Sequence, residues 1–418
     1  MVSTPLRWLS VVLFVAAAPG WAQAQRFHLP DPSYVYGPRF GPPLRDRNAT
    51  ELPKPPSADE LRRDQALAAL GRVLFYEPLL SRNGQRSCGS CHQQQHAFAD
   101  PRRFSTGHTG RATERNSMSL VHLADLSPAP YQTRGVGFFW DGRAKTLEAA
   151  VLQPIQHPVE MGLPLELLPE RLAMDPAYGA LFLAAFGSDL VTAGRVGAAL
   201  ARFLRAIESR ASRYDEGLAQ VPHVVVDFPG FTAAENRGKR LFLGSVSGAP
   251  GACASCHMGS RPVTCGPSAS VDATCFQTFE LRNTGLEQRD QRAGATPGVA
   301  GNPQRTDRFR APSLRNVEVT GPYMHDGRFQ TLEEVVRFYA RGVRPHRNLD
   351  AMLQGGGAGW RSGWGGSSDS DRDPHAMAEL GLPMNRQQQA DLVAFLRTLT
   401  DRELLRDPRF ADPFRNGR

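Results

Sequence analysis

The chain lacks the features of a membrane protein, a β-sheet protein and a nucleic-acid-binding protein. After residue 24, no apolar run approaches the ~20 residues that a membrane-spanning helix needs. Apolar and polar residues do not alternate over any length, so the sequence predicts a mainly α fold. The net charge is +8, but the arginines are scattered and no basic stretch is interleaved with aromatic residues, which argues against nucleic acid as a partner. The charge favours an acidic protein partner, although a solvated surface explains it equally well.

Cysteine is also scarce, with six in 418 residues. Four of the six form two Cys-x-x-Cys-His motifs, which are the attachment signature of c-type haem. A zinc site built from the four thiols is the alternative, but structural zinc modules place their cysteine pairs closer together. We therefore expect two covalently bound haem c groups. The predicted haem-binding residues are Cys88, Cys91, Cys253 and Cys256 as thioether ligands and His92 and His257 as proximal iron ligands.

The other two cysteines, Cys265 and Cys275, flank a segment rich in Ser, Ala and Gly just after the second motif. In an oxidising compartment a disulfide is the expected outcome. Two unpaired thiols are the alternative, because sequence alone does not fix the Cβ geometry.

The first 24 residues have the pattern of a secretory signal peptide. Arg7 supplies the positive charge, an apolar run follows from Trp8 to Ala18, and Ala22–Ala24 offers a small-residue cleavage site. We expect a mature chain that begins at Gln25 and a periplasmic location in a bacterium, because c-type haem is attached after export.

The second half of the chain repeats the first. Asp141–Arg143 is followed by Thr146–Glu148, and Asp326–Arg328 is followed by Thr331–Glu333, at an offset of 185 residues. The repeat predicts two haem domains. The predicted boundaries are 1–24 for the signal peptide, 25–56 for an extended N-terminal arm, 57–215 for the first haem domain, 216–230 for a linker and 231–418 for the second haem domain, with a Gly/Ser-rich loop at 355–370.

Helix signals support this organisation. Capping boxes at Ser57 with Glu60 and at Thr232 with Glu235 come before the two haem motifs. Residues 192–209 and 386–400 are predicted to be helical, and Thr146 and Thr331 are expected to cap equivalent helices.

Overlaying the halves at Asp-Gly-Arg reveals one difference. Thirteen residues after the aspartate the first half has Pro154 and the second has Tyr339. Proline cannot ligate iron, whereas a tyrosinate can. If this helix covers the distal face, the first haem keeps an open position for substrate and the second is closed by oxygen. The alternative for Tyr339 is a buried core aromatic.

Four motifs resemble those of the bacterial dihaem cytochrome c peroxidases and the related MauG-type dihaem enzymes. They are Trp140–Arg143, Pro158–Met161, Ser313–Asn316 and Thr320–Gly327, and the resemblance covers about residues 58–400. It implies two class-I cytochrome c-like domains related by internal duplication, each with one haem, and one Ca²⁺ between them.

The resemblance also implies roles for single residues. Glu160 is then the acid-base residue at the peroxidatic first haem, Trp140 carries electrons between the haems, and His108 caps the first haem at rest. The alternatives are an exposed carboxylate, a buried indole and a surface loop histidine. The implied calcium ligands are Asn116, Thr320 and Pro322, and Arg315 is the implied partner of a haem propionate.

One departure from the peroxidases is informative. Those enzymes usually ligate the second haem with methionine, whereas MauG-type proteins have tyrosine, as Tyr339 is here. An anionic oxygen ligand lowers the reduction potential. Met324, Met352 and Met384 remain alternative ligands if the overlay is wrong.

Three functions follow from these observations. The first is a periplasmic cytochrome-c peroxidase-like oxidoreductase that reduces hydrogen peroxide with electrons from a small cytochrome c or cupredoxin. The second is a MauG-type enzyme that uses peroxide and a high-valent dihaem state to oxidise residues of a partner protein. The third is a non-enzymatic dihaem electron carrier or redox sensor, against which Glu160 beside an open haem argues. A homodimer is one oligomeric state that the sequence allows.

Overall fold

The computed structural model describes residues 35–37, 57–124, 137–244, 253–258, 276, 281–286, 308–346, 348–354 and 380–414, and the statements below concern these residues. The predicted signal peptide, the 355–370 loop, and Cys265 and Cys275 with their predicted disulfide lie outside the described residues. Most of the predicted arm at 25–56 lies outside them as well.

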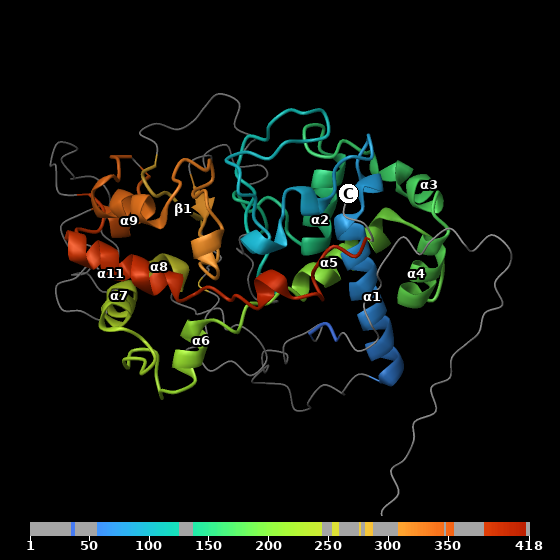
Figure 1. The fold of residues 1–418 in the computed structure, drawn as a ribbon. Coiled ribbons are helices and arrows are strands. Elements are labelled where there is room, and N and C mark those ends of the chain that lie inside the picture. Colours follow the sequence, from blue (N-terminus) through green and yellow to red (C-terminus); the bar gives the residue numbers. More distant parts are fainter. Residues whose placement is uncertain are drawn as a thin grey trace, which may run out of the picture.

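The described chain consists of helices joined by loops, with one two-stranded sheet, and this confirms the predicted mainly α class (Figure 1). The α-helices are α1 (Ala58–Tyr76), α2 (Leu147–Gln156), α3 (Leu168–Ala173), α4 (Ala177–Phe186), α5 (Ala193–Arg205), α6 (Arg213–Leu218), α7 (Ala233–Leu243), α8 (Cys253–His257), α9 (Leu332–Arg341) and α11 (Arg386–Arg397). The antiparallel strands are β1 (Leu281–Arg282) and β2 (Phe309–Arg310). The 3₁₀ helices are Pro78–Leu80, Cys88–Ser90, Gln94–His96, Leu165–Leu167, Val317–Val319, Ala351–Leu353 and Leu404–Arg406. Among the described helices, none combines the length and apolarity needed to cross a membrane.

The helix starts follow the predicted capping residues. The hydroxyl of Ser57 accepts a hydrogen bond from the N–H of Glu60 at 3.2 Å, and the Glu60 carboxylate accepts one from the N–H of Ser57 at 2.7 Å. Thr232 with Glu235 forms the same reciprocal box at α7. A capping box also starts α9, whereas α2 has only the side-chain cap of its N-terminal threonine.

The repeated sequence folds into a repeated structure around Asp-Gly-Arg. Helices α2 and α9 each have ten residues, and their bounds differ by 185 positions. The loop before each helix closes with a β-bridge, Phe138 with Ala144 and Tyr323 with Phe329. Gly142 has a φ of 69° and the equivalent glycine of the second half has 60°, a left-handed conformation that glycine adopts without steric cost.

Two pairs of helices cross at equivalent glycines. Helix α1 packs against α5, and α7 packs against α11. A Cβ atom on Gly71 would lie 2.0 Å from the carbonyl oxygen of Ala199, and one on Gly238 would lie 1.9 Å from that of Asp391. Only glycine fits at these two crossings, because a methyl group would overlap a backbone oxygen.

The helices surround separate hydrophobic cores, and Figure 1 shows α1–α5 on one side of the molecule and α7, α9 and α11 on the other. The first core includes Phe75 and Phe203, and the second includes Phe242 and Phe395. A smaller third cluster forms around Phe338.

Packing crosses the predicted domain boundaries in two places. Tyr214 and Phe228, from the end of the predicted first domain and from the linker, belong to the second core. Residues near the C-terminus return to the first core, where the Arg72 Nε donates to the carbonyl of Ala411 at 2.7 Å and the Tyr76 hydroxyl donates to that of Phe410 at 2.7 Å. The chain therefore crosses between the two cores twice.

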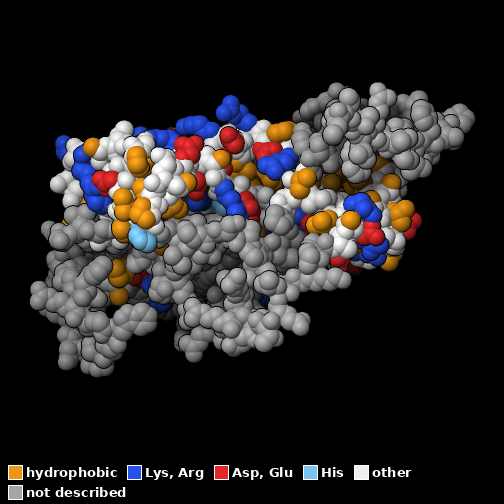
Figure 2. All heavy atoms as spheres, turned by 90° about the horizontal axis from the view of Figure 1, so that it is seen from below, with side chains coloured by type: hydrophobic (Ala, Val, Ile, Leu, Met, Phe, Trp, Pro, Cys, Tyr) orange, Lys and Arg blue, Asp and Glu red, His pale blue; other side chains and the backbone are white. Residues whose placement is uncertain are grey.

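Charged side chains of both signs mix on the described surface. On the face shown in Figure 2, Lys and Arg side chains are interspersed with Asp and Glu side chains and with apolar ones. Arg397 on α11 pairs with Glu333 on α9 at 2.8 Å, and Arg205 on α5 pairs with Glu148 on α2 at 2.6 Å. On the described part of this face, positive side chains are therefore accompanied by negative ones.

Candidate functional site

The first Cys-x-x-Cys-His motif follows α1 and begins with the 3₁₀ helix Cys88–Ser90. Burial raises the pKa of the Cys88 thiol to about 12 and also raises that of Cys91. His92 Nδ1 lies 2.7 Å from the carbonyl oxygen of Phe98, and because a carbonyl only accepts, Nδ1 is the donor. This leaves Nε2 with a lone pair for a metal, and burial lowers the pKa of His92, which favours the neutral ring that ligation requires.

The second motif forms α8 and has the same arrangement. His257 Nδ1 donates to the carbonyl of Pro312 at 3.1 Å, and burial lowers the pKa of His257 to about 4. Burial also raises the pKa of Cys253 to about 12. Cys88 packs against the first core and Cys253 against the second, so the two cysteine pairs serve separate sites and do not form one zinc centre.

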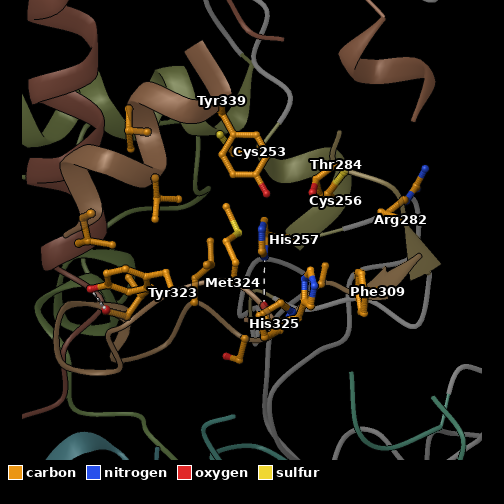
Figure 3. Close-up of a pocket in the computed structure, with 18 of the residues that line it drawn as sticks. Cys253, Cys256, His257, Arg282, Thr284, Phe309, Tyr323, Met324, His325 and Tyr339 are labelled. Carbon is orange, nitrogen blue, oxygen red and sulfur yellow. Dashed lines mark hydrogen bonds between the residues drawn. The ribbon is translucent and has the colours of Figure 1, made fainter. Parts of the chain in front are cut away.

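A cavity surrounds the second motif, and most of its lining is apolar. It is lined by Cys253, Cys256 and His257 on one side and by residues of α9 and α11 on another. Figure 3 shows the hydroxyl of Tyr339 directed from α9 into this cavity. Burial raises the pKa of the Tyr339 phenol, so the neutral phenol is the stable form in the described protein. The structure thus brings Tyr339 into the same cavity as the second haem motif.

The methionines that the sequence left as alternatives also line this cavity. Met324 points into it in Figure 3, and Met352 and Met384 belong to its lining. The geometry therefore brings one phenol and three thioethers to the same site, and Tyr339 as the iron ligand stays a prediction.

Trp140 lies where the two halves meet. Its indole Nε1 donates to the carbonyl of Asn116 at 2.8 Å, and its own carbonyl accepts from the N–H of Arg310 at 2.7 Å. The indole lines the second cavity and contacts the ring of His325 edge-on, with 6.4 Å between ring centroids. Trp140 thus belongs to the first half by sequence and to the second site by position.

Glu160 is held by the turn that ends α2. Its N–H donates to the carbonyl of His157 at 3.1 Å, and the N–H of Met161 donates to the carbonyl of Pro154 at 3.2 Å. The Glu160 side chain is 34% exposed, and its carboxylate lies 3.4 Å from His157 Nδ1. Burial raises the pKa of this carboxyl, while His157 and Arg143 act in the opposite direction.

The carboxylate of Glu160 also lies close enough to the first haem motif to raise the pKa of Cys88 and Cys91 by charge repulsion. The structure therefore places a titratable group with a raised pKa beside the first haem motif, as an acid-base residue requires.

His108 packs directly on the segment that carries Glu160. Its N–H donates to the Glu160 carbonyl at 2.8 Å, and its ring occupies the space beside Gly162, where a Cβ would lie 2.4 Å from Cε1. Gly107 lies even closer to Val159, whose carbonyl oxygen would be 1.5 Å from a Cβ at position 107. His108 Nδ1 is buried and has no hydrogen-bond partner among the described residues. The predicted loop histidine and the predicted acid-base residue are thus neighbours.

The three predicted calcium ligands all contribute to the lining of one cavity. Asn116, Thr320 and Pro322 all line the second cavity. The Asn116 amide nitrogen donates to the carbonyls of Arg102 and Arg103 at 3.1 and 3.3 Å. Its Oδ1 therefore remains as the side-chain atom for a hard cation. Calcium binding itself stays a prediction.

Arg315 has a carboxylate partner within the protein. Its Nη1 donates to Asp215 at 2.6 Å and to the hydroxyl of Ser212 at 3.2 Å, and its guanidinium lies over the rings of Tyr214 and Phe276. Of the described arginines, Arg310 and Arg282 line the second cavity and Arg315 does not.

Sequence reasoning missed Arg310 and His157. Arg310 becomes buried only through tertiary packing, which leaves no periodic signal in a two-residue strand. The contact between His157 and Glu160 could have been predicted from the sequence. His157 stands three residues before Glu160 and next to a proline, and a turn at such a position brings the two residues together.

Comparison with known proteins agrees with this geometry. Residues 65–221 match the family model of di-haem cytochrome c peroxidase. A methylamine utilization protein MauG from Paracoccus denitrificans is 34% identical over 389 residues, which are 84% of this chain and 93% of that protein. The cytochrome c551 peroxidase of Nitrosomonas europaea is 32% identical over 66% of this chain and 73% of its own length. The crystal structure of a MauG-like protein associated with microbial copper homeostasis has a TM-score of 0.60 and 32% identity, with coverage of 88% of this chain and 99% of that one.

Proposed function

Because the chain belongs to the family of dihaem cytochrome c peroxidases and MauG-type enzymes, we propose that it reduces hydrogen peroxide at its first haem site with electrons relayed from the second. Family membership makes it a peroxide-using oxidoreductase and sets aside a purely electron-carrying or sensing role. The observation that carries the proposal is the carboxyl of Glu160. It has a raised pKa, its charge acts on both cysteines of the first haem motif, and the next residue, Met161, accepts a hydrogen bond at 2.8 Å from the N–H of Arg82 in the segment before that motif.

The described residues fit two c-type haems. Each motif offers half-buried thiols for thioether bonds and a neutral histidine whose Nδ1 is already hydrogen-bonded, which orients Nε2 as the ligand. The second cavity is mainly apolar, as a porphyrin requires, and it also contains a buried guanidinium that suits a propionate. When bound, haem supplies an iron that accepts and releases single electrons.

The residues of the first site provide the proton chemistry. The overall reaction consumes one peroxide, two electrons and two protons and yields two water molecules. We infer that the Glu160 carboxylate takes the proton from one peroxide oxygen and returns it to the other, which then leaves as water. His157, 3.4 Å from Glu160 and 48% exposed, connects this carboxylate to solvent. We propose that His108 caps the first site at rest and leaves it on reductive activation.

The residues of the second site provide the electron path. We infer that Trp140, which lies at the seam between the sites, would carry electrons between a haem held by His257 and one held by His92. In this proposal two class-I cytochrome c-like domains carry the haems, and a calcium ion at Asn116, Thr320 and Pro322 holds the domains together. The predicted export signal places the enzyme in the periplasm, where a small cytochrome or cupredoxin is the donor.

One observation favours a second candidate function. The phenol of Tyr339 lies in the second cavity, and oxygen ligation there lowers the reduction potential, which disfavours electron uptake from a cytochrome. Two of the proteins similar to this chain are a MauG and a MauG-like protein. The second candidate is therefore peroxide-driven oxidation of residues on a partner protein.

A single kinetic experiment separates the two candidates. The purified dihaem protein is mixed with hydrogen peroxide, and a reduced small cytochrome c is then added while its oxidation is followed. Rapid steady turnover at two cytochromes per peroxide supports the peroxidase. Slow discharge of the peroxide-treated protein supports oxidation of a protein substrate, and an absence of any reaction with peroxide would contradict both.

A further inference from the structure

The side chain of Arg310 is buried without partners for several of its donors. Arg310 lies in β2, is 4% exposed and lines the second cavity. Its Nε and Nη1 have no hydrogen-bond partner among the described residues. Its Nη2 lies 3.7 Å from the sulfur of Met118, which is a weak acceptor. Burial lowers the pKa of the guanidinium to about 10, so Arg310 still carries its charge at neutral pH.

A buried guanidinium in this state needs an anion. Removing a charge from water costs several kcal/mol unless an opposite charge and hydrogen bonds compensate it. The planar guanidinium of arginine matches a carboxylate, which can accept two parallel hydrogen bonds from it. A haem fixed at Cys253 and Cys256 brings propionate carboxylates into the cavity that Arg310 lines.

We propose that Arg310 binds a propionate of the second haem and fixes that edge of the haem at the seam between the two halves. The inference rests on the proposed dihaem function. It names a partner for the propionate other than Arg315, which the family resemblance implied. Arg310 takes this role in place of Arg315.

The other two arginines near the site are already neutralised by the protein. Arg315 pairs with Asp215 at 2.6 Å, and Arg282 pairs with Asp350 at 2.7 Å. Binding a propionate at either of these arginines would add a second negative charge to an existing ion pair. At Arg310 the propionate neutralises a charge that the described residues leave unpaired.

The position of Arg310 connects the haem to the electron path. Its backbone N–H donates to the carbonyl of Trp140 at 2.7 Å, and its side chain reaches Met118 of the first half. A propionate bound by Arg310 would therefore be held by a residue whose backbone is hydrogen-bonded to that of Trp140. The cation also offsets the negative charge of the propionate, which favours the reduced form of the second haem.

The test is a reductive titration of the holoprotein with Arg310→Gln, in which the spectra of the two haems are followed separately. We expect the midpoint potential of the second haem to fall. At the wild-type midpoint the ratio of oxidised to reduced second haem should rise about tenfold, which is 59 mV for a one-electron couple. The first haem should keep its potential. Arg237→Gln, which removes a guanidinium of α7 that pairs with Asp391 outside the cavity, is the matched control and should change neither potential.

Arg310→Lys provides a second measurement if the glutamine variant folds poorly. It keeps the charge but not the planar fork, so the vibrational modes of one propionate should shift in resonance Raman spectra of the variant. Unchanged propionate modes, or an unchanged second potential in Arg310→Gln, would overturn the role of Arg310. A fall caused by Arg315→Gln and not by Arg310→Gln would overturn it as well. A wild-type protein without the second haem would contradict the proposed function too, whereas two bound haems with an indifferent Arg310 would contradict this inference alone.

Discussion

Helices α2 and α9 have the same length, the same threonine cap and the same loop before them, yet they present different chemistry. At one position of this shared scaffold α2 has Pro154 and α9 has Tyr339. At the same offset beyond the helices, the first half has Glu160 and the second has Pro345. In the first half, a proline that cannot bind iron is accompanied by the carboxylate of Glu160. In the second half, the phenol of Tyr339 is accompanied by a proline that cannot exchange protons.

The surroundings of the two sites differ in the same sense. In the first site the Glu160 carboxylate lies 3.4 Å from His157 Nδ1, and the Glu160 backbone carbonyl accepts a hydrogen bond from the His108 N–H. In the second, burial keeps His257 neutral, with a pKa of about 4, and raises the pKa of Tyr339. The two equivalent helices therefore stand in different surroundings, one beside a titratable carboxyl with a raised pKa and the other carrying a buried neutral phenol.

The strongest way to break this comparison is to remove the carboxylate from the first half. We expect Glu160→Gln to lower the rate of peroxide turnover by about 10²–10⁴, the usual contribution of general acid-base catalysis, while both haems stay bound. Steady-state turnover and haem content measure the two effects. Glu166→Gln, at an exposed position nearby, is the control and should keep wild-type activity. Retained activity in Glu160→Gln would show that the first half does not supply the acid-base residue.

The second test acts on the other half. Tyr339→Phe removes the phenol oxygen from the second cavity, so we expect the optical and electron paramagnetic resonance spectra of one of the two haems to change and those of the other to stay the same. Tyr323→Phe is a matched control, because Tyr323 lines the same cavity but its hydroxyl donates to the carbonyl of Val317 at 2.9 Å. Unchanged spectra for Tyr339→Phe would point to one of the cavity methionines.

A third test asks whether the two scaffolds are mechanically equivalent. Gly71→Ala and Gly238→Ala each place a methyl group against a backbone oxygen, so each should lower the free energy of unfolding by about 1–3 kcal/mol. Chemical denaturation measures the losses, which we expect to be similar. Gly194→Ala in α5 is the control, because its Cβ would meet only the hydroxyl of Thr192 at 4.0 Å and it gains helix propensity. A loss in only one half would show that the crossings are not equivalent.

The smallest expected effect is a shift of the pH profile. Glu160 must be deprotonated to accept a proton, so turnover should fall as the pH drops through its pKa. Burial raises that pKa, which places the acid limb above the usual glutamate range near 4.3. Protonated His157 lowers the same pKa, so His157→Gln should move the acid limb to higher pH. A pH profile that moves to lower pH, or not at all, would exclude this coupling.

Local signals in the sequence were sufficient for much of this comparison. The haem motifs, the capping boxes and the repeated loop before α2 and α9 each depend on residues a few positions apart, and the structure confirms the helix starts at Ser57, Thr232 and Thr331. The final predicted helix at 386–400 is α11, which ends at Arg397.

Contacts between distant segments could not be predicted in this way. The burial of Arg310, and the pairing of Arg315 with Asp215, depend on loops that meet only in the folded chain. Neither residue stands in a periodic pattern. Nothing in the sequence therefore indicates that Arg315 is paired with a carboxylate and that Arg310, among the described residues, is not. The resemblance implied Arg315 as the propionate partner, and that role stays a prediction. The pairing of Arg315 with Asp215 and the burial of Arg310 are contacts that only the folded chain reveals.

The return of residues 404–414 to the first core has a consequence for the order of folding. Leu404, Phe410 and Phe414 are buried against side chains that the ribosome makes more than two hundred residues earlier. A chain that is synthesised from its N-terminus cannot complete the first core until its last segment has been made. The half that is made first is thus finished last, and a truncation before Leu404 should unfold the N-terminal half before the C-terminal one.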